Sequence, residues 1–362
     1  MSAPDVMAQI LDLARWAPSG DNTQPWRFEV QDGAHLVVRG SDTRTHCVYD
    51  LDGHPSQLSL GALIETISVA ASGHGLRVAV SRRGGLPETL PTFDLRFTPD
   101  SDLQPSPLIS AIPLRSVQRR PYSARALTDV EKQALEACLE PGYQLRWFEG
   151  LGPKWQMARL MFNNAGLRLT LHEAFEVHRA IIHWGRRYSP DRVPDQALGA
   201  DALTLKLMRW AMQDWARLQF LNKWLAGTWA PRLQMDLLPG LLCGAHFVLL
   251  RGSAPSQLDD YVEAGRVVQR LWLTATALGL QHQPELTPLI FARYVREGRP
   301  FSSSPAGQAL ARQLADQSQR LIGTDLPQAV WIARIGQAPA ASSRSVRRSR
   351  SDLTLPGPGR TV

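Results

Sequence analysis

The sequence predicts an α+β protein made of two related halves, and two pairs of repeated segments carry this prediction. The first pair is GAHLVVRGS at residues 33–41 and GAHFVLLRGS at residues 244–253. Each is a short aliphatic run that ends in Arg-Gly-Ser, which is typical of a buried strand followed by a turn. The second pair, residues 61–76 and 265–280, has equal length and ends in Gly-Leu after apolar residues at helical spacing. Because both pairs occur in the same order, we infer an internal duplication.

Two similar halves are expected to pack about a pseudo-two-fold axis, as the subunits of a homodimer do. The repeated helices are rich in small residues, which favours close packing, so we expect central helices flanked by mixed or antiparallel sheets. A length of 362 residues suits this plan, since it exceeds what one core usually supports. A chain that carries both halves is expected to be a monomer that resembles a dimer, or a weak homodimer.

The first half, residues 1–105, is expected to begin with a helix over residues 5–16. A turn-forming segment and a strand over residues 27–30 follow, and then the repeated strand and helix. The second half, residues 106–340, comes after a proline-rich linker at residues 99–113.

A helix is predicted at residues 129–139 of the second half, where Thr128 and Glu131 form a capping box. Residues 153–239 or thereabouts form a helical insert, which is a candidate lid, and residues 341–362 form a basic C-terminal tail. The five tryptophans of the insert leave two interpretations open, core filling or a cap over a planar ligand: Trp184, Trp210, Trp215, Trp224 and Trp229.

The composition is that of an ordinary globular protein, with 44% hydrophobic and 20% charged residues, and it excludes wholesale disorder. The net charge of +7 suits a nucleic acid, a membrane surface or a small phosphorylated ligand. Over half of the excess lies in four arginines of the tail, Arg344, Arg347, Arg348 and Arg350.

Cysteine usage and hydropathy predict a soluble protein of a reducing cytoplasm. Cys47, Cys138 and Cys243 form no CxxC pair, which argues against a disulfide scaffold or a cysteine-based zinc site. The first fifteen residues lack the features of a signal peptide. The most apolar stretch, residues 237–250, is too short to span a bilayer.

Several common site types are not supported by the sequence. His172 and Glu176 are four residues apart on one predicted helical face, as metal ligands can be, but HExxH is absent and we expect no metal site. GxGxxG, GxxxxGK[ST] and GxSxG are also absent, so no Rossmann site, P-loop or hydrolase elbow is indicated.

Two polar segments are candidates for ligand contact. Residues 18–22, Pro-Ser-Gly-Asp-Asn, stop a helix and continue with turn formers, which describes a plain tight turn or a loop whose N–H groups face a ligand. Arg115 and Arg119, with Ser116 near them, form the densest internal basic cluster. Paired guanidiniums suit a phosphate, but from the residues alone a solvated surface patch is the more common outcome.

The segment WAPSGDNTQPWRF, residues 16–28, resembles the signature of the nitroreductase family of FMN flavoproteins, whose pattern is APSxxNxQPW before a strand. Residues 277–284, ALGLQHQP, resemble the end of the family's helix and its flavin-contacting loop. Residues 115–122 resemble the arginine-rich opening of a family subunit. The resemblance covers both halves apart from the insert, and it is closest to fused members with two family-like halves in one chain. It implies a nitroreductase-like fold.

The resemblance implies FMN as cofactor and a set of residues that bind it. Arg115 and Arg119 would hold the phosphate with help from Ser116, although Val117 stands where the family usually has Ser or Thr, at a cost on the order of 1 kcal/mol. The other implied contacts are Pro18, Ser19, Gly20, Asn22 and Gln24 at the ribityl chain or ring edge, Gln283 and Pro284 near N5, and Arg347 or Arg348 at the phosphate. No catalytic side chain is implied, since the flavin carries the chemistry.

Family enzymes are homodimers that bind FMN between subunits, and in this chain only one such composite site is complete. It combines the arginines and the Gly-Leu loop of the second half with the Pro-Ser loop of the first. The reciprocal site has no arginine before Arg15. Its expected approach to the strand, residues 238–243, is apolar and lacks Ser and Asn. We therefore expect one FMN per chain.

The implied function is an FMN-dependent oxidoreductase. It would take a hydride from NAD(P)H at flavin N5 and reduce a small electron-poor acceptor, such as a nitroaromatic, quinone or enone, by ping-pong kinetics. An alternative is an FMN-binding or flavin-sequestering protein, in which the insert acts as a lid and turnover is low. Specialised flavin chemistry in biosynthesis is a third hypothesis. Nucleic-acid binding rests on the tail alone and is least favoured, and no membrane partner is expected.

Overall fold

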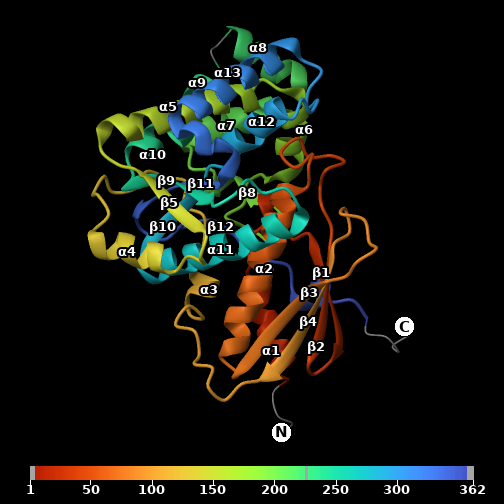
Figure 1. Cartoon of the computed structure of the whole chain (residues 1–362). Coiled ribbons are helices and arrows are strands. Elements are labelled where there is room, and N and C mark those ends of the chain that lie inside the picture. Colours follow the sequence, from red (N-terminus) through yellow and green to blue (C-terminus); the bar gives the residue numbers. More distant parts are fainter. Residues whose placement is uncertain (1–4, 225–226, 357–362) are drawn as a thin grey trace.

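The computed structural model describes residues 5–224 and 227–356. The molecule has a sheet with two helices at one end, a second sheet in the middle, and a thick helical layer at the other end (Figure 1). Its helices up to the second sheet are α1 (Val6–Ala14), η1 (Gly20–Asn22), α2 (His54–Ser72), α3 (Ala111–Leu114) and α4 (Asp129–Ala137). Those that follow are α5 (Leu151–Arg168), α6 (His172–Ile181), η2 (Asp195–Ala197), α7 (Ala202–Ala211), α8 (Trp215–Trp224), α9 (Trp229–Arg232), η3 (Leu233–Leu237), α10 (Leu238–Leu241), α11 (Leu258–Ala277), α12 (Thr287–Arg296), α13 (Pro305–Ile322), η4 (Gly323–Gln328) and α14 (Arg350–Leu353).

The two four-stranded sheets have the same topology. The first contains β1 (Trp26–Asp32), β2 (His35–Gly40), β3 (Leu76–Arg82) and β4 (Thr92–Pro99) in the order β1-β2-β4-β3. The second contains β5 (Tyr143–Phe148), β9 (Ala245–Arg251), β10 (Leu280–Pro284) and β11 (Ala329–Gln337) in the order β5-β9-β11-β10. All neighbours pair antiparallel. In each sheet, a long helix joins the second strand to the third.

The repeated segments occupy equivalent positions in the two sheets. The repeated strands are β2 and β9, and the repeated helical sequences lie in α2 and α11. The strand that follows the Pro-Ser loop is β1, whose topological counterpart is β5. The segment of the second half that matches the Pro-Ser loop is therefore residues 138–142, which precede β5. The expectation of residues 238–243 is wrong, because that segment precedes β9, the counterpart of β2.

Helices α2 and α11 cross in close contact, and two glycines permit it. A Cβ added to Gly61 would lie 1.9 Å from Val262 O, and one added to Gly265 would lie 2.1 Å from Leu58 O. Each glycine thus meets the residue three positions before the other. No side chain fits at either place, so both positions require glycine.

The insert extends a hairpin turn. Strands β1 and β2 are joined by residues 33–34, whereas β5 and β9, which pair in the same way, are separated by residues 149–244. The excursion therefore begins earlier and ends later than the expected 153–239. Three short strands, β6 (Ile182–His183), β7 (Tyr188–Ser189) and β8 (Val193–Pro194), lie within it.

The second sheet is buried on both faces. Along β9, Val248 and Leu250 join a core with α5, α12 and α13, while Phe247 and Leu249 join a core with α11. This is the period of two that a strand imposes on its side chains. The first sheet packs one face on α1 and α2 around Phe28, Leu36 and Leu95.

The C-terminal segment returns to the first half of the chain. Strand β12 (Arg344–Ser345) pairs with β7 of the insert, and Leu355 N–H donates to Phe28 O at 2.7 Å. Residues 344–355 thus connect the insert to β1.

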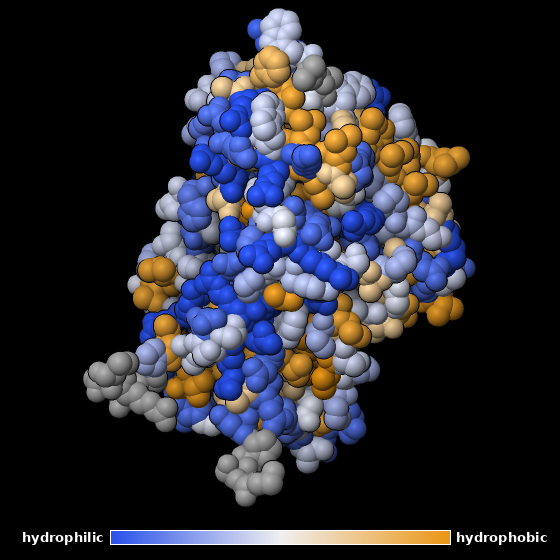
Figure 2. Space-filling model, turned by 180° about the vertical axis from the view of Figure 1, so that it is seen from behind, coloured by the Kyte–Doolittle hydropathy of each residue, from blue (hydrophilic) through white to orange (hydrophobic). Residues whose placement is uncertain are grey.

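Seen from behind, the surface has a broad hydrophilic band through its centre and hydrophobic patches towards the helical end (Figure 2). Within the described residues, no helix is both long and apolar enough to cross a membrane.

Candidate functional site

A cavity of about 370 Å³ lies where the first half, the second half, the insert and the C-terminal segment meet. Its volume falls within the range of small-molecule and cofactor sites, and most of its lining is apolar. Pro18, Ser19, Gly20 and Asn22 line it together with Arg115, Ser116, Arg119, Gln283, Pro284 and Arg347. Segments far apart in the sequence therefore converge on one partly open cavity.

The Pro-Ser loop has a strained backbone. Asp21, Asn22 and Gln24 have φ angles of 51°, 63° and 52°, and they are the non-glycine residues with positive φ in residues 5–224 and 227–356. Residues other than glycine rarely adopt positive φ angles, and those that do often lie at ligand sites. The loop also holds itself in place, because Ser19 Oγ accepts a hydrogen bond of 2.9 Å from Gln24 N–H.

Asn22 connects the loop to two other segments and keeps one atom free. Its amide nitrogen donates to Val346 O at 3.1 Å and to Arg192 O at 3.3 Å, so it ties the C-terminal segment and the insert to the loop. Its Oδ1 atom is buried and has no hydrogen-bond partner among the described residues. A ligand hydroxyl or N–H would satisfy it.

Three arginines, Arg115, Arg344 and Arg347, gather at one end of the cavity, and we call them the arginine cluster. They bond only to carbonyl oxygens: Arg115 to Trp16 O at 3.2 Å, Arg344 to Pro113 O at 3.0 Å, and Arg347 to Ala17 O at 2.9 Å. No carboxylate in the described part of the chain forms a salt bridge with any of them. Arg115 Nε and Arg344 Nε are buried without a partner.

The electrostatics of the arginine cluster favour an anion. Burial lowers the pKa of Arg115, and the charges of Arg347 and Arg344 lower it further. Burial, assisted by Arg344, lowers the pKa of Arg347 to about 9. The guanidiniums stay protonated at neutral pH while they repel one another, so a bound anion would relieve both the burial and the repulsion.

The Trp272 ring packs beside the arginine cluster. The Arg115 guanidinium stacks 4.4 Å from the Trp272 ring centroid, and Arg344 stacks 5.1 Å from that of Trp16. These cation–π contacts orient the arginines without neutralising them. Trp272 comes from α11 and lines the cavity, as does Trp331 of β11.

The structure separates Arg119 from Arg115. Residues 115–119 are not helical, and four residues in extended conformation span up to about 13 Å. Arg119 donates to Ala197 O at 3.2 Å, and its charged neighbours are Asp21, Arg334 and Arg168 rather than the arginine cluster. Ser116 lines the cavity beside Arg115. Val117 forms a bridge with His282, so its backbone anchors this segment to β10.

Gln24 and Arg348 lie outside the cavity. The Gln24 side chain is fully buried and donates to Pro190 O at 2.8 Å, while its Oε1 accepts from Arg348 N–H at 3.0 Å. Gln24 is therefore a support for the loop. Arg347, and not Arg348, turns into the cavity.

The cavity is also lined by a second polar set, three of whose members come from the insert, one from the Pro-Ser loop and one from the segment between β2 and α2. We call it the insert-side group: Asp21, Tyr49, Arg168, His178 and Asp236. Arg168 of α5 donates to Asp236 Oδ1 at 3.3 Å, and Tyr49 Oη lies 3.0 Å from His178 Nε2. Burial raises the pKa of both Asp21 and Asp236 to about 6 and lowers that of His178 to about 3.

Sequence reasoning did not find Arg344, Trp272 or the insert-side group. The four arginines of the tail were a visible signal for Arg344, but nothing local shows that the tail folds back. The insert tryptophans divide between the interpretations: Trp184 packs against a small core of the insert and Trp215 against Phe175, as core filling predicts. Trp210, Trp224 and Trp229 are 41%, 66% and 54% exposed, and none of the five lines the cavity as a cap would.

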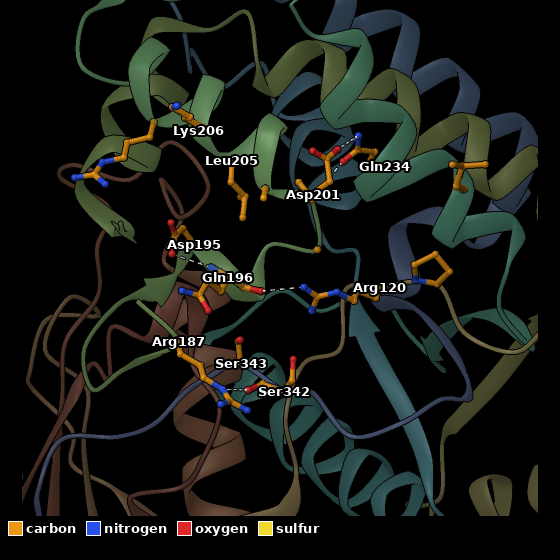
Figure 3. A pocket seen from close by; sticks show the side chains of 16 residues that line it. Arg120, Arg187, Asp195, Gln196, Asp201, Leu205, Lys206, Gln234, Ser342 and Ser343 are labelled. Carbon is orange, nitrogen blue, oxygen red and sulfur yellow. Dashed lines mark hydrogen bonds between the residues drawn. The ribbon is translucent and has the colours of Figure 1, made fainter. Parts of the chain in front are cut away.

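A second hollow, of about 940 Å³, lies on the outer side of the same wall. Figure 3 shows Arg120 reaching the Gln196 carbonyl and Arg187 reaching that of Ser342. The acids present are already used, since Asp201 caps α7 and Asp195 accepts the N–H groups of Gly185 and Arg186. The cationic side chains that line this hollow are exposed. It is therefore a weaker candidate for a ligand site than the cavity described above. In the described ranges, no three His, Cys, Asp or Glu side chains gather as metal ligands would.

No protein-family model matches the chain, and no curated protein matches it. The solved structures that resemble the chain include the following two. A nitroreductase-like family protein from Bacillus cereus is 14% identical, with a TM-score of 0.35, over 70% of this chain and 97% of that chain. A protein from Anabaena variabilis, provisionally described as a nitroreductase, is 12% identical, with a TM-score of 0.36, over 84% of this chain and 69% of that chain. At this level of likeness, the cavity residues and not these neighbours carry the functional conclusion.

Proposed function

We propose that the chain binds FMN in the partly open cavity and is an FMN-dependent oxidoreductase that uses NAD(P)H. The observation that carries this proposal is the arginine cluster, in which Arg115 and Arg347 are buried, Arg344 is half-buried and none has a carboxylate partner among the described residues, beside a strained loop with the APSxxNxQPW pattern. A phosphate dianion supplies the charge that this end of the cavity lacks.

The residues present fit the parts of FMN. Arg115, Arg344 and Arg347 would hold the phosphate with Ser116, so Arg344 takes the place that Arg119 was expected to fill. Asn22 Oδ1 and Gln283 Oε1, both buried without partners, would accept hydrogen bonds from the ribityl hydroxyls or the ring N–H.

The apolar middle of the cavity suits the planar ring system. Trp272, Val268 and Pro284 line it from the second half, and Leu58 and Ala62 from the first. Bound there, the flavin supplies two-electron chemistry, accepting electrons from NAD(P)H and passing them to an acceptor. The protein's part is to bind, to orient and to exclude water.

We further propose that the chain is a fused pair of nitroreductase-like halves, with the insert as a lid. The identical strand order supports the pair, and so do the reciprocal contacts of Gly61 and Gly265. The helix pairing is reciprocal as well. Gln269 bonds Thr66 at 2.9 Å, and the equivalent positions, Glu65 and Arg270, bond each other at 2.8 Å.

The same correspondence supports one FMN per chain and a monomer that resembles a dimer. Ser59 and Ala62 line the cavity, and their counterparts in α11 are Glu263 and Arg266. Arg266, which is larger than its counterpart Ala62, pairs with Glu65 at 3.2 Å. It stands where a second, reciprocal cavity would need a small residue. Residues 138–142, the counterpart of the loop end, also lack Ser and Asn.

A flavin-sequestering protein is the second candidate, and the insert favours it. Ala165, Leu169, Ile182, Leu198 and Met235, all from residues 149–244, line the cavity and cover it. If this cover stays closed, a nicotinamide has no place to stack on the flavin. The two candidates share the FMN site and differ only in access.

Purified protein, reconstituted with FMN and freed of excess, tests both. We expect one FMN per chain and anaerobic loss of the yellow flavin absorbance with NADH or NADPH. A ratio of two contradicts the single site, and flavin that neither donor reduces supports sequestration.

A matched pair of variants tests the arginine cluster. Arg115→Met is expected to weaken FMN binding about 100-fold, because it removes a buried charge-assisted contact, whereas Arg348→Met should bind FMN as the wild type does. Equal affinity of the two variants, measured by calorimetry, would sink the assignment.

A further inference from the structure

Arg168 lies at the centre of the insert-side group. Its charge acts on the carboxyls of Asp21 and Asp236 and on the ring of His178, lowering the pKa of each. These residues come from the loop, from η3 and from α6, so several elements converge on one guanidinium. The Arg168 side chain is 26% exposed, and it lines the cavity.

The hydrogen bonds of Arg168 are incomplete. One terminal nitrogen reaches Asp236 Oδ1 at 3.3 Å, which is long for a bond between charged groups, and Nε is buried without a partner among the described residues. A guanidinium offers five N–H donors in a planar fork that matches a carboxylate. Most of the N–H donors of Arg168 therefore have no hydrogen-bond partner among the described residues.

The neighbours of Arg168 do not neutralise it fully. Asp21 and Asp236 have pKa values raised by burial to about 6, so both carry a proton for part of the time near that pH. His178 has a pKa lowered by burial to about 3 and is neutral at physiological pH. Arg119 adds a second positive charge nearby. Near pH 6, where each carboxyl is about half protonated, the two guanidiniums therefore carry an excess of roughly one positive charge, which one further anion would offset.

The charge of Arg168 does not act on the arginine cluster. The charges that act on Arg115 are Arg347 and Arg344, and those that act on Arg347 are Arg344 and Arg15; Arg168 is in neither set. A single FMN phosphate occupies one cationic end and leaves the other for the second substrate. Apolar side chains of the insert lie between, among them Ile181, Val193 and Met208.

We propose that Arg168 binds the carboxylate of the electron acceptor, so that the preferred substrates are small, planar, unsaturated or aromatic monocarboxylates. This inference rests on the proposed function, since FMN must take the other end. Ile181, Val193 and Met208 contact the apolar body of the acceptor, and the insert thereby provides its recognition.

The test compares two probes of nearly equal shape, 4-nitrobenzoate and the neutral 4-nitrobenzamide, titrated into the FMN-loaded protein. The wild type is expected to bind the carboxylate about 30-fold more tightly than the amide, the value of one charge-assisted hydrogen-bond pair. Arg168→Gln should abolish this preference and leave FMN content unchanged. Arg168→Lys, which keeps the charge but not the fork, should retain part of it.

Arg159 provides the matched control, because it lies on the same helix α5 and is exposed. Arg159→Gln should keep the full preference for 4-nitrobenzoate. Where the protein turns over, the KM for 4-nitrobenzoate should rise in Arg168→Gln, while kcat and the KM for the amide stay near wild type.

Two outcomes overturn the inference. One is FMN-loaded wild type that binds both probes equally, and the other is a preference for the carboxylate that survives in Arg168→Gln. Failure of the proposed function looks different, since the protein would then hold no FMN or hold flavin that NADH and NADPH leave oxidised. Arg168→Lys keeps the test decisive if the glutamine variant does not fold.

Discussion

Arg334 and Arg115 are both buried arginines of the second half, and they differ in their partners. Arg334 pairs with Glu285 at 3.1 Å, and Glu285 pairs with His246 at 2.9 Å, so each cation of this triad has a carboxylate partner within the protein. Arg115 has only a carbonyl and an aromatic face. Burying an unpaired charge is costly, so the second arrangement supports the proposed anion site, whereas the first belongs to the core.

The buried triad predicts a pH dependence of stability. Burial alone would lower the pKa of His246, but the carboxylate of Glu285 raises it from 6.5 to about 10. A group whose pKa is raised on folding stabilises the native state below its unfolded pKa and loses this contribution as the pH rises through the folded one. The contribution of His246 is thus present below about pH 6.5 and lost towards pH 10.

Urea unfolding of wild type and His246→Gln at several pH values measures this contribution. The difference between their free energies of unfolding should shrink by roughly 2–5 kcal/mol between pH 6.5 and pH 10. The exposed His46→Gln is the control and should follow the wild-type curve throughout. A constant difference between His246→Gln and wild type would contradict the assignment.

At this scale, local sequence identified the loop but not all of its partners. The APSxxNxQPW pattern places Pro18, Ser19 and Asn22 because their turn chemistry is local. Arg344 joins the cavity only because residues after 340 cross back over the insert, a long-range event that no local pattern records. Conversely, Arg115 and Arg119 look paired in sequence and are parted by an extended backbone.

At the scale of elements, the α2–α11 contact is the most demanding packing in the described structure. Gly61 and Gly265 let the two backbones approach so closely that even a methyl group has no room. Because the contact is reciprocal, the two positions should be equally intolerant. Overpacking at such a place forces backbone shifts.

Gly61→Ala and Gly265→Ala are each expected to lower the free energy of unfolding by about 3 kcal/mol. Gly152→Ala is the control, since Gly152 also lies in a helix, α5, and has nothing within 4 Å of an added Cβ. It should stay within about 1 kcal/mol of wild type. Strongly unequal effects at Gly61 and Gly265 would argue against the reciprocal contact.

Elements with a strict period were predictable, and the borders of the insert were not. The repeated strands and helices carry periods of two and 3.6, which survive divergence because they place side chains in the core. The insert begins directly after Phe148, because β5 and β9 are hairpin partners. The repeated segments do not include β5, so they do not show that β5 pairs with β9.

At the scale of the whole molecule, the C-terminal segment links the parts of the site. It passes the insert at β12, delivers Arg344 and Arg347 to the cavity, and ends along β1. Cutting the chain after Ala341 removes both arginines, and Leu353 with them, which is fully buried in the core of the first half.

If FMN is the ligand, this truncation should weaken its binding at least about 100-fold, because two buried charge-assisted contacts are lost. Calorimetric titration of FMN measures the loss. Removing residues 357–362 alone is the control and should leave the affinity unchanged. Full affinity in the shorter chain would show that the segment plays no part in binding.

The position of the insert in a hairpin has one more consequence. Residues 149–244 leave β5 and re-enter at β9 from adjacent, hydrogen-bonded ends. Such a segment can change in length and sequence while the sheet register stays as it is, provided that β7, which holds Arg344 through β12, is kept. If the proposed function holds, recognition of the acceptor can therefore change with the insert while the first half of the chain keeps its fold.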